Sequence, residues 1–185
     1  MSKFEFVLVI VSLVLGLSIT TLLQGGADLY RARRRIRLDW LTWFWVVGLL
    51  ATQAQLFFGA WGLRDRGEWG PWMLFSFMLG PILLFASSVL LLPRVDIETP
   101  HSMVEYRQGD GRFSLLCLAG YHVWAAVSSV LVNPSWTPDG TIAGLAIAGL
   151  LVATTFVRQR FASWVLTLTY LGYAALALFS TPALR

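Results

Sequence analysis

The stretch Tyr30-Arg-Ala-Arg-Arg-Arg-Ile-Arg37 places five arginines within seven residues, between two long apolar runs. Basic clusters of this kind mark the cytoplasmic side of a membrane protein, because the distribution of Lys and Arg between short loops sets the orientation of the chain. The stretch therefore separates the first two predicted membrane spans, and it predicts on which side of a bilayer each later segment lies.

The composition of the chain is that of a membrane protein. Charged residues make up 13% of its 185 residues, about half the roughly 25% of an ordinary soluble domain. Uncharged runs of 18 residues or more recur six times, and about 20 residues cross a bilayer as a helix. We therefore predict an all-α, polytopic transmembrane helical bundle, one domain of six spans, over residues 4–25, 38–63, 71–93, 113–132, 140–157 and 161–181.

The first span is predicted to be retained rather than removed as a signal peptide. A signal peptide has an apolar core of about 7–15 residues behind a basic start. This run is longer, begins beside Glu5 and leads into the arginine cluster. We expect its helix to end at the pair Gly25-Gly26, because glycine commonly caps helix C-termini.

The basic residues divide unevenly between the two sides of the predicted bundle. With the N-terminus outside, ten of the 14 fall on the inner side, namely Arg31, Arg33, Arg34, Arg35, Arg37, Arg94, Arg107, Arg112, Arg158 and Arg160. The other four fall outside, namely Lys3, Arg64, Arg66 and Arg185. The positive-inside rule therefore predicts that both termini are periplasmic.

Membrane lipid explains the net charge of +4 better than nucleic acid does. The sequence has no basic module outside the membrane, whereas the cytoplasmic leaflet is anionic. We expect no nucleic-acid partner, and we expect lipid contact from Arg31, Arg33, Arg34, Arg35 and Arg37. On the same side, residues 94–112 are predicted to form a solvated connector, with a short surface helix from Thr99 to Arg107 as the alternative.

Polar side chains within the spans are candidates for a pore or solute site, because burying them in hydrocarbon is costly. In the first span, Glu5 and Ser12 share one helical face with Gly16 and Thr20, for which close helix packing is the alternative role. His122 lies at the midpoint of the fourth span. It is a candidate proton or solute ligand, and the alternative is a neutral buried histidine with a carbonyl or hydroxyl partner.

Gln53 and Gln55 are further candidates, in the second span. They point about 200° apart on a helix, so that they cannot share a face. One is expected to point into the bundle and the other to meet a neighbouring chain. Interhelical hydrogen bonding is the alternative role for both.

Glycine and proline positions predict where the helices bend or pack closely. Gly80 and Pro81 in the third span and Gly172 in the sixth are candidate helix kinks. A second pattern places small residues four apart in the fifth span. This candidate packing seam, within the chain or between copies, consists of Gly140, Gly144 and Ala148.

The sequence lacks the common signatures of enzyme chemistry. It contains no Walker phosphate loop, no dinucleotide-binding glycine fingerprint, no HExxH motif and no Gly-x-Ser-x-Gly elbow. Cys117 is the single cysteine, and the two histidines, His101 and His122, lie in different segments. We therefore expect no enzyme activity, no cofactor and no bound metal.

The first half of the chain resembles a set of small bacterial inner-membrane proteins for which no activity is established. The likeness lies in the opening from Phe4 to Gly25, which starts Phe-Glu-Phe and contains Gly-Leu-Ser-Ile-Thr-Thr-Leu-Leu at 16–23. It extends to the arginine cluster, the Trp-rich second span and the stretch around Gly80-Pro81. The resemblance implies a multi-pass protein of the bacterial inner membrane, and it implies no activity.

Two functions remain open for such a bundle. The sequence favours permeation of an ion or small solute by a homo-oligomeric channel or small transporter, with Glu5 at the outer mouth and His122 at mid-depth. The alternative is a non-transporting membrane subunit or sensor that binds a partner protein or lipid.

Overall fold

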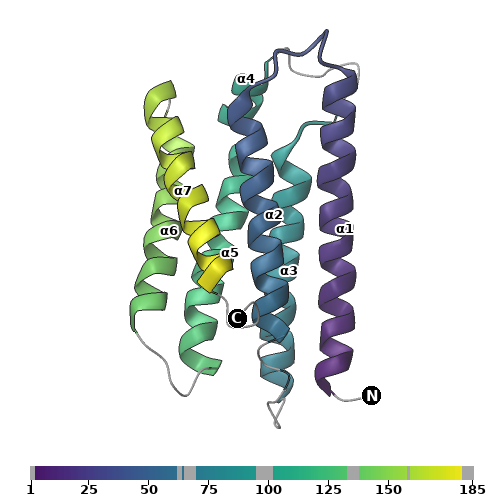
Figure 1. Ribbon diagram of the computed structural model, residues 1–185, viewed down its shortest axis with the longest axis vertical. Helices are drawn as coiled ribbons and strands as arrows, with labels where there is room; N and C mark the ends of the chain where they lie inside the picture. Colours follow the sequence, from purple (N-terminus) through teal and green to yellow (C-terminus); the bar gives the residue numbers. More distant parts are fainter. Residues whose placement is uncertain are drawn as a thin grey trace.

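The computed structural model describes residues 3–61, 64, 70–94, 102–132, 138–157 and 159–180. Seven helices make up most of this part of the chain (Figure 1). They are α1 Lys3–Arg31, α2 Trp40–Trp61, α3 Pro71–Leu91, α4 Met103–Gln108, α5 Arg112–Val132, α6 Pro138–Phe156 and α7 Arg160–Ser180.

All of these helices except the short α4 are long and apolar enough to cross a membrane. They coincide with the six predicted spans to within a few residues at most ends. Many large apolar side chains on the outside of the bundle stay exposed, among them Leu13, Phe75 and Phe161. Such a surface suits lipid tails better than water. The all-α prediction is confirmed, and the structure supports an integral, multi-pass membrane protein.

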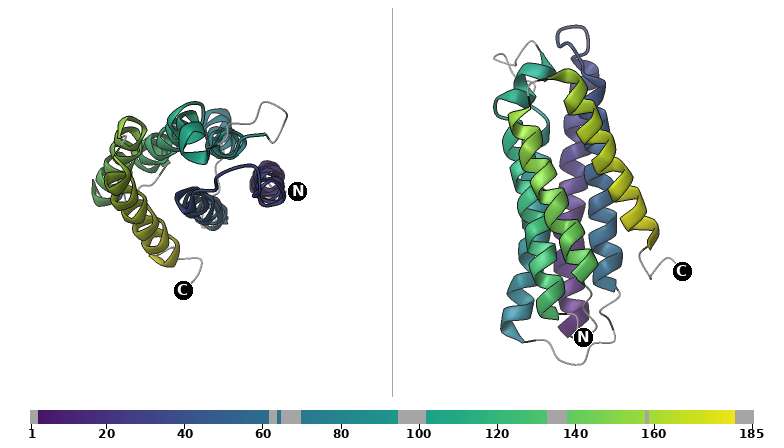
Figure 2. Two further views of the ribbon diagram at one scale, coloured as in Figure 1. Left: turned by 90° about the horizontal axis from the view of Figure 1, so that it is seen from above. Right: turned by 90° about the vertical axis from the view of Figure 1, so that its left-hand side faces the viewer.

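The six long helices alternate in direction along the bundle (Figure 1). The start of α1 and the end of α7 therefore lie toward one end, and the arginine cluster and α4 lie at the other. Helix α5 makes the most extensive contacts, with α3 on one side and α6 on the other. Contacts between α6 and α7, between α7 and α2 and between α2 and α3 complete a ring. Helix α1 packs outside this ring, against α3 and α2 (Figure 2).

Helix α1 is longer than its predicted span. Its buried residues recur every three or four positions, which is the spacing of one helical face: Val7, Val11, Leu15, Ser18, Leu22, Gly26 and Leu29. The predicted end at Gly25-Gly26 is wrong, because the helix continues to Arg31. A Cβ at Gly25 would lie 3.1 Å from Leu92 Cδ1, and one at Gly26 would lie 3.3 Å from Trp43 Cζ3. The glycine pair thus serves close packing.

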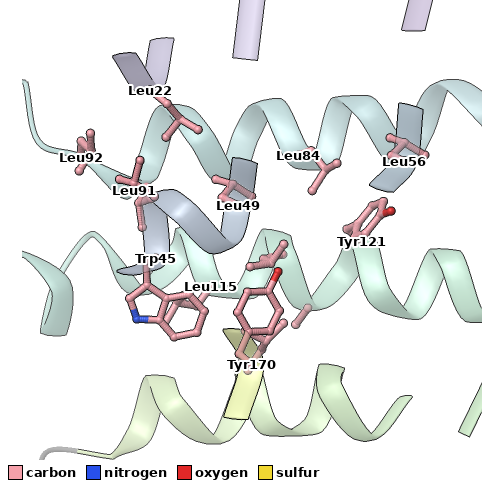
Figure 3. Packing of buried hydrophobic residues seen from close by; sticks show 14 of the residues in the cluster. Leu22, Trp45, Leu49, Leu56, Leu84, Leu91, Leu92, Leu115, Tyr121 and Tyr170 are labelled. Atoms are coloured by element: carbon pink, nitrogen blue, oxygen red, sulfur yellow. The ribbon is translucent and has the colours of Figure 1, made fainter. Parts of the chain in front are cut away.

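The core of the ring contains aromatic rings between α2 and α7 (Figure 3). Trp45 stacks on Tyr170, with ring centroids 5.1 Å apart and planes 28° apart. A Cβ at Gly48 would come within 2.9 Å of Tyr170 Cε1. The missing side chain at Gly48 therefore allows the Tyr170 ring to lie against α2.

In the connector between α3 and α5, residues 102–111 are docked rather than solvated, which corrects the prediction for this part; residues 95–101 of the predicted connector lie outside the described residues. It contains α4, a shorter helix than the alternative from Thr99 to Arg107, and its Met103 is buried. The Met103 N–H donates to the Arg37 carbonyl at 3.2 Å. The Tyr106 hydroxyl donates to the Leu90 carbonyl at 3.0 Å. These contacts fix α4 across the arginine-rich end of the bundle.

Candidate functional site: buried polar side chains and an arginine-lined cavity

Gln53 joins three helices through a buried hydrogen-bond network. Its Nε2 donates to Ser18 Oγ of α1 at 2.8 Å and to Ser88 Oγ of α3 at 2.9 Å. The two serine oxygens lie 2.6 Å apart, and Ser88 also donates to the Leu84 carbonyl. Because the one hydroxyl hydrogen of Ser88 is donated to the Leu84 carbonyl, the Ser18 hydroxyl is the donor in the bond between the two serines. The network thus links α1, α2 and α3.

One atom of this network has no partner. Gln53 Oε1 is buried and accepts no hydrogen bond within the part of the chain that the structure describes. Turning the amide over would bring Oε1 to the serines and leave Nε2 without its two acceptors. Either orientation leaves one polar end of Gln53 buried and unsatisfied, which is costly in an apolar interior.

A second hydrogen-bonded pair joins α2 to α7. Thr52 Oγ1 lies 2.6 Å from the Tyr170 hydroxyl oxygen and donates to the Gly48 carbonyl. Since the threonine hydrogen is used on Gly48, Tyr170 is the donor to Thr52. Thr52 and Gln53 are neighbours in sequence, about 100° apart on the helix. They therefore point to different neighbours, Thr52 to α7 and Gln53 to α1 and α3.

Helices α3 and α5 are joined by a reciprocal serine pair. Ser87 Oγ donates to the Ser114 carbonyl at 3.0 Å, and Ser114 Oγ donates to the Ser87 carbonyl at 2.8 Å. Both serines are buried. Hydroxyls that satisfy the backbone of a neighbouring helix are a common means of helix association in membranes.

His122 lies among aromatic rings and away from the Gln53 network. Its ring centroid is 5.2 Å from that of Tyr121, 5.9 Å from Tyr170 and 5.7 Å from Tyr173. The side chain is buried, and Nε2 has no hydrogen-bond partner among the described residues. The hydroxyl or carbonyl partner that the sequence suggested as the alternative is not found at this atom among the described residues.

The candidate polar face of α1 lies on the outer surface of the protomer. Glu5 and Ser12 are exposed, and a Cβ at Gly16 would meet nothing within 4 Å. Ser12 Oγ donates to the Leu8 carbonyl and Thr20 Oγ1 to the Gly16 carbonyl of the same helix. These hydroxyls are satisfied locally.

The five candidate pore residues are therefore not brought together. Gln53 is in the α1–α2–α3 network, and His122 is among the tyrosines between α5 and α7. Glu5 and Ser12 face outward, and Gln55 is partly exposed elsewhere on α2.

The candidate kinks and the packing seam are mostly contact sites. Helix α3 continues through Gly80 and Pro81, and a Cβ at Gly80 would clash with the Trp124 ring of α5. A Cβ at Gly172 would meet nothing within 4 Å. In the seam of α6, Gly144 and Ala148 are buried, with Gly144 against α5, and Gly140 is exposed.

The arginine cluster is exposed at one end of the bundle. Arg31 pairs with Asp28 at 3.2 Å, and the Arg33 guanidinium lies 4.2 Å from the centre of the Tyr30 ring. Arg34, Arg35 and Arg37 are exposed as well. The cluster thus presents a basic surface rather than a set of buried ion pairs.

Beside this end lies a cavity of about 160 Å³ that sequence inspection does not identify. Its walls come from α2, α4, α5, α6 and α7, and its polar lining includes Arg107, Arg112, Thr154, Thr155, Ser163 and Thr167. These residues lie in four separate stretches of sequence, so that only the fold brings them together. The one feature of the sequence that could have indicated this cavity is the group of hydroxyl-bearing residues at the end of α6 and the start of α7.

Arg107 is held in place from α2. Its Nη2 lies 3.7 Å from Asp39 Oδ2, and Asp39 Oδ1 accepts from the Leu41 N–H at the start of α2. Asp39 therefore caps α2 and anchors α4 at once. Nearby on α4, burial raises the pKa of Tyr106 above its ordinary value, and the negative charge of Asp110 adds to the rise.

Comparison with protein-family models, curated proteins and solved structures gives no match for this chain. Among the described residues, no three His, Cys, Asp or Glu side chains gather where a metal ion could bind. The case for a function therefore rests on the geometry of the bundle.

Proposed function

We propose that this chain is a non-transporting protein of the bacterial inner membrane that binds anionic lipid through its arginine-rich end. The observation that carries the proposal is the dispersal of the candidate pore residues. Gln53 is engaged with Ser18 and Ser88, and Glu5 lies on the outer surface. A permeation route needs its polar groups along one path, whereas these groups join helices or face outward.

The proposed orientation places the arginine-rich end in the cytoplasm and both termini in the periplasm. The basic residues of the turn after α1 are exposed at the end of the bundle where α4 docks. Exposed arginines next to a span are attracted to the anionic cytoplasmic leaflet by roughly 1 kcal/mol each. The resemblance of the first half of the chain to bacterial inner-membrane proteins supports localisation in the bacterial inner membrane.

A second candidate is permeation by a homo-oligomer, and one observation favours it. The exposed face of α1 carries Glu5, Ser12, Gly16 and Thr20 in one stripe, open to contact with another protomer. Several copies that met along this stripe would line a path with Glu5 at one mouth. This function requires assembly, whereas lipid binding requires one protomer.

Purified protein in vesicles separates the two functions. For a lipid-binding protein, we expect ion, proton and solute leakage equal to that of vesicles without protein, and we expect anionic lipid to co-purify in excess over zwitterionic lipid of the same chain length. Flux that depends on protein and is lost in Glu5→Gln would favour the oligomeric pore. Equal retention of both lipids would contradict the lipid-binding proposal.

A further inference from the structure

We propose that the cavity lined by Arg107 and Arg112 is a binding site for a phosphate group, such as that of an anionic lipid headgroup. The inference rests on the proposed function, because it assigns the lipid selectivity of the arginine-rich end to one place. The exposed arginines of the turn after α1 provide a general attraction, and the cavity provides the specific site.

The cavity has the size for a small anion. One water molecule needs roughly 10–15 Å³ of such space, and this cavity has about 160 Å³. It therefore holds a phosphate group together with several waters. Its position at the arginine-rich end of α5 and α6 is the depth at which lipid headgroups lie when these helices span a bilayer.

The charge of the lining suits a phosphate. Arg107 and Arg112 both contribute to the wall, and the Asp39 carboxylate lies 3.7 Å from Arg107. Arg112 lies at the open side of the cavity, because it is exposed and its guanidinium is 5.2 Å from the centre of the Phe113 ring. Two positive charges against one negative charge leave an excess of +1 among these three side chains. A guanidinium presents five N–H donors in a plane and can bind two phosphate oxygens at once. Basic pockets between membrane helices on the cytoplasmic side bind phosphate headgroups in this way.

Hydroxyl groups complete the lining from α6 and α7. Thr155 Oγ1 donates to the Val152 carbonyl, and Thr167 Oγ1 donates to the Ser163 carbonyl. A hydroxyl hydrogen rotates about its C–O bond to suit its partner, so that these groups can donate to a phosphate oxygen when one is bound. Five helices thus surround one polar space, which makes the site sensitive to how they pack.

The competing explanation for these arginines is a structural role, in which they would bind the carbonyl groups that end α6. Thr154, Thr155, Phe156 and Val157 line the same cavity, and the last carbonyls of a helix attract cations. The two roles differ in what a substitution changes. Loss of a capping arginine lowers thermal stability without lipid, and loss of a ligand-binding arginine lowers lipid retention.

The test compares Arg112→Gln with Arg34→Gln, which removes the same charge from a second exposed arginine that does not line the cavity. Each protein is extracted and washed in high salt, which weakens the general attraction between lipid and separate exposed charges. Bound anionic lipid is then counted by native mass spectrometry, and the melting temperature is measured. Since a charge-assisted bidentate contact is lost, we expect Arg112→Gln to lower retention on the order of tenfold. Arg34→Gln removes one of five neighbouring charges that provide only the salt-screened general attraction, so that we expect it to lower retention far less.

Arg112→Lys keeps the charge and serves as the second variant if Arg112→Gln does not fold. A lysine lacks the planar fork, so that we expect partial retention, between those of the wild type and Arg112→Gln. To identify the source of the phosphate, thermal shifts are recorded with inorganic phosphate, glycerol phosphate and a short-chain anionic lipid. Stabilisation by the lipid alone supports a headgroup, and equal stabilisation by all three supports a soluble phosphate compound at the same site.

Equal losses of lipid in Arg112→Gln and Arg34→Gln would overturn the cavity site and leave general lipid binding intact. A lower melting temperature with unchanged retention would assign Arg112 to the end of α6 and also overturn the site. If wild-type protein retained no excess of anionic lipid and gained no stability from phosphate, both the site and the proposed function would fail.

Discussion

Single buried polar atoms determine how the helices of this protein associate. Gln53 reaches one serine on α1 and another on α3, Thr52 meets Tyr170 of α7, and Ser87 meets Ser114 of α5. In a bilayer the hydrophobic effect does not drive helices together, so that such hydrogen bonds and close packing take its place. These residues therefore join the helices to one another.

The Gln53 network predicts energetic coupling between α1 and α2. A double-mutant cycle of Gln53→Leu and Ser18→Ala should give a coupling free energy of about 0.6 kcal/mol, and at most about 1.7 kcal/mol, because interhelical hydrogen bonds in membranes have this range. Reversible unfolding in mixed micelles measures it. Gln55→Leu with Ser18→Ala is the control cycle, and its two changes should add. Coupling of equal size in both cycles would refute the network.

A side chain at position 80 should destabilise the protein, because helix α5 packs closely against Gly80. A Cβ at this position would clash with the Trp124 ring, and Trp124 donates a hydrogen bond to Ser76 Oγ at 3.3 Å that holds the ring in place. Gly80→Ala should therefore lower stability by about 1–3 kcal/mol, the range for overpacking. Gly172→Ala should change it by about 1 kcal/mol or less, toward higher stability, because nothing lies within 4 Å. Similar unfolding curves for the two variants would contradict this packing.

Sequence inspection selects Gln53 and His122 as notable, because polar groups are rare in apolar runs. It does not find Ser18 or Ser88 as partners of Gln53, since the pairing depends on how three helices are rotated about their axes. The sequence also suggests Glu5 and Ser12 as pore residues. A helical face that carries hydroxyl groups can nevertheless face lipid when these hydroxyls donate to the backbone of their own helix, as Ser12 does.

At the scale of the elements, α4 is the least expected part of the fold. It has six residues, too few to be stable alone, and it is held by Met103, Tyr106 and Arg107. Hydropathy predicts the six spans because each must cross the same thickness of hydrocarbon. It does not predict α4, or the continuation of α1 through Gly25-Gly26, because both depend on contacts with other helices.

The docking of α4 should depend on pH through Tyr106. The pKa of Tyr106 is raised in the folded protein. The contribution of the Tyr106 hydroxyl to docking is therefore complete at pH values below the ordinary tyrosine pKa of about 10. It is lost as the pH rises through the raised pKa. Hydrogen exchange of α4 amides at increasing pH measures this. Tyr106→Phe should remove the pH dependence and weaken docking by about 0.5–1.5 kcal/mol. The same dependence in Tyr106→Phe would exclude Tyr106 as its origin.

At the scale of the whole molecule, the arginines predict the orientation of the bundle. In a Cys117→Ala background, Arg64→Cys should react with a membrane-impermeant maleimide in intact spheroplasts, because residue 64 lies on the proposed periplasmic side. Arg35→Cys should react only after the membrane is permeabilised. The opposite labelling pattern would reverse the proposed topology and place the cavity in the outer leaflet.

The most direct measurement is an experimental structure of the protein in nanodiscs that contain anionic lipid. We expect a protomer in which Ser18, Gln53 and Ser88 form one closed network and a phosphate headgroup lies between Arg107 and Arg112. A ring of protomers around a water-filled path lined by Glu5 and Ser12, with the arginine-lined cavity empty, would contradict the proposal and establish the pore.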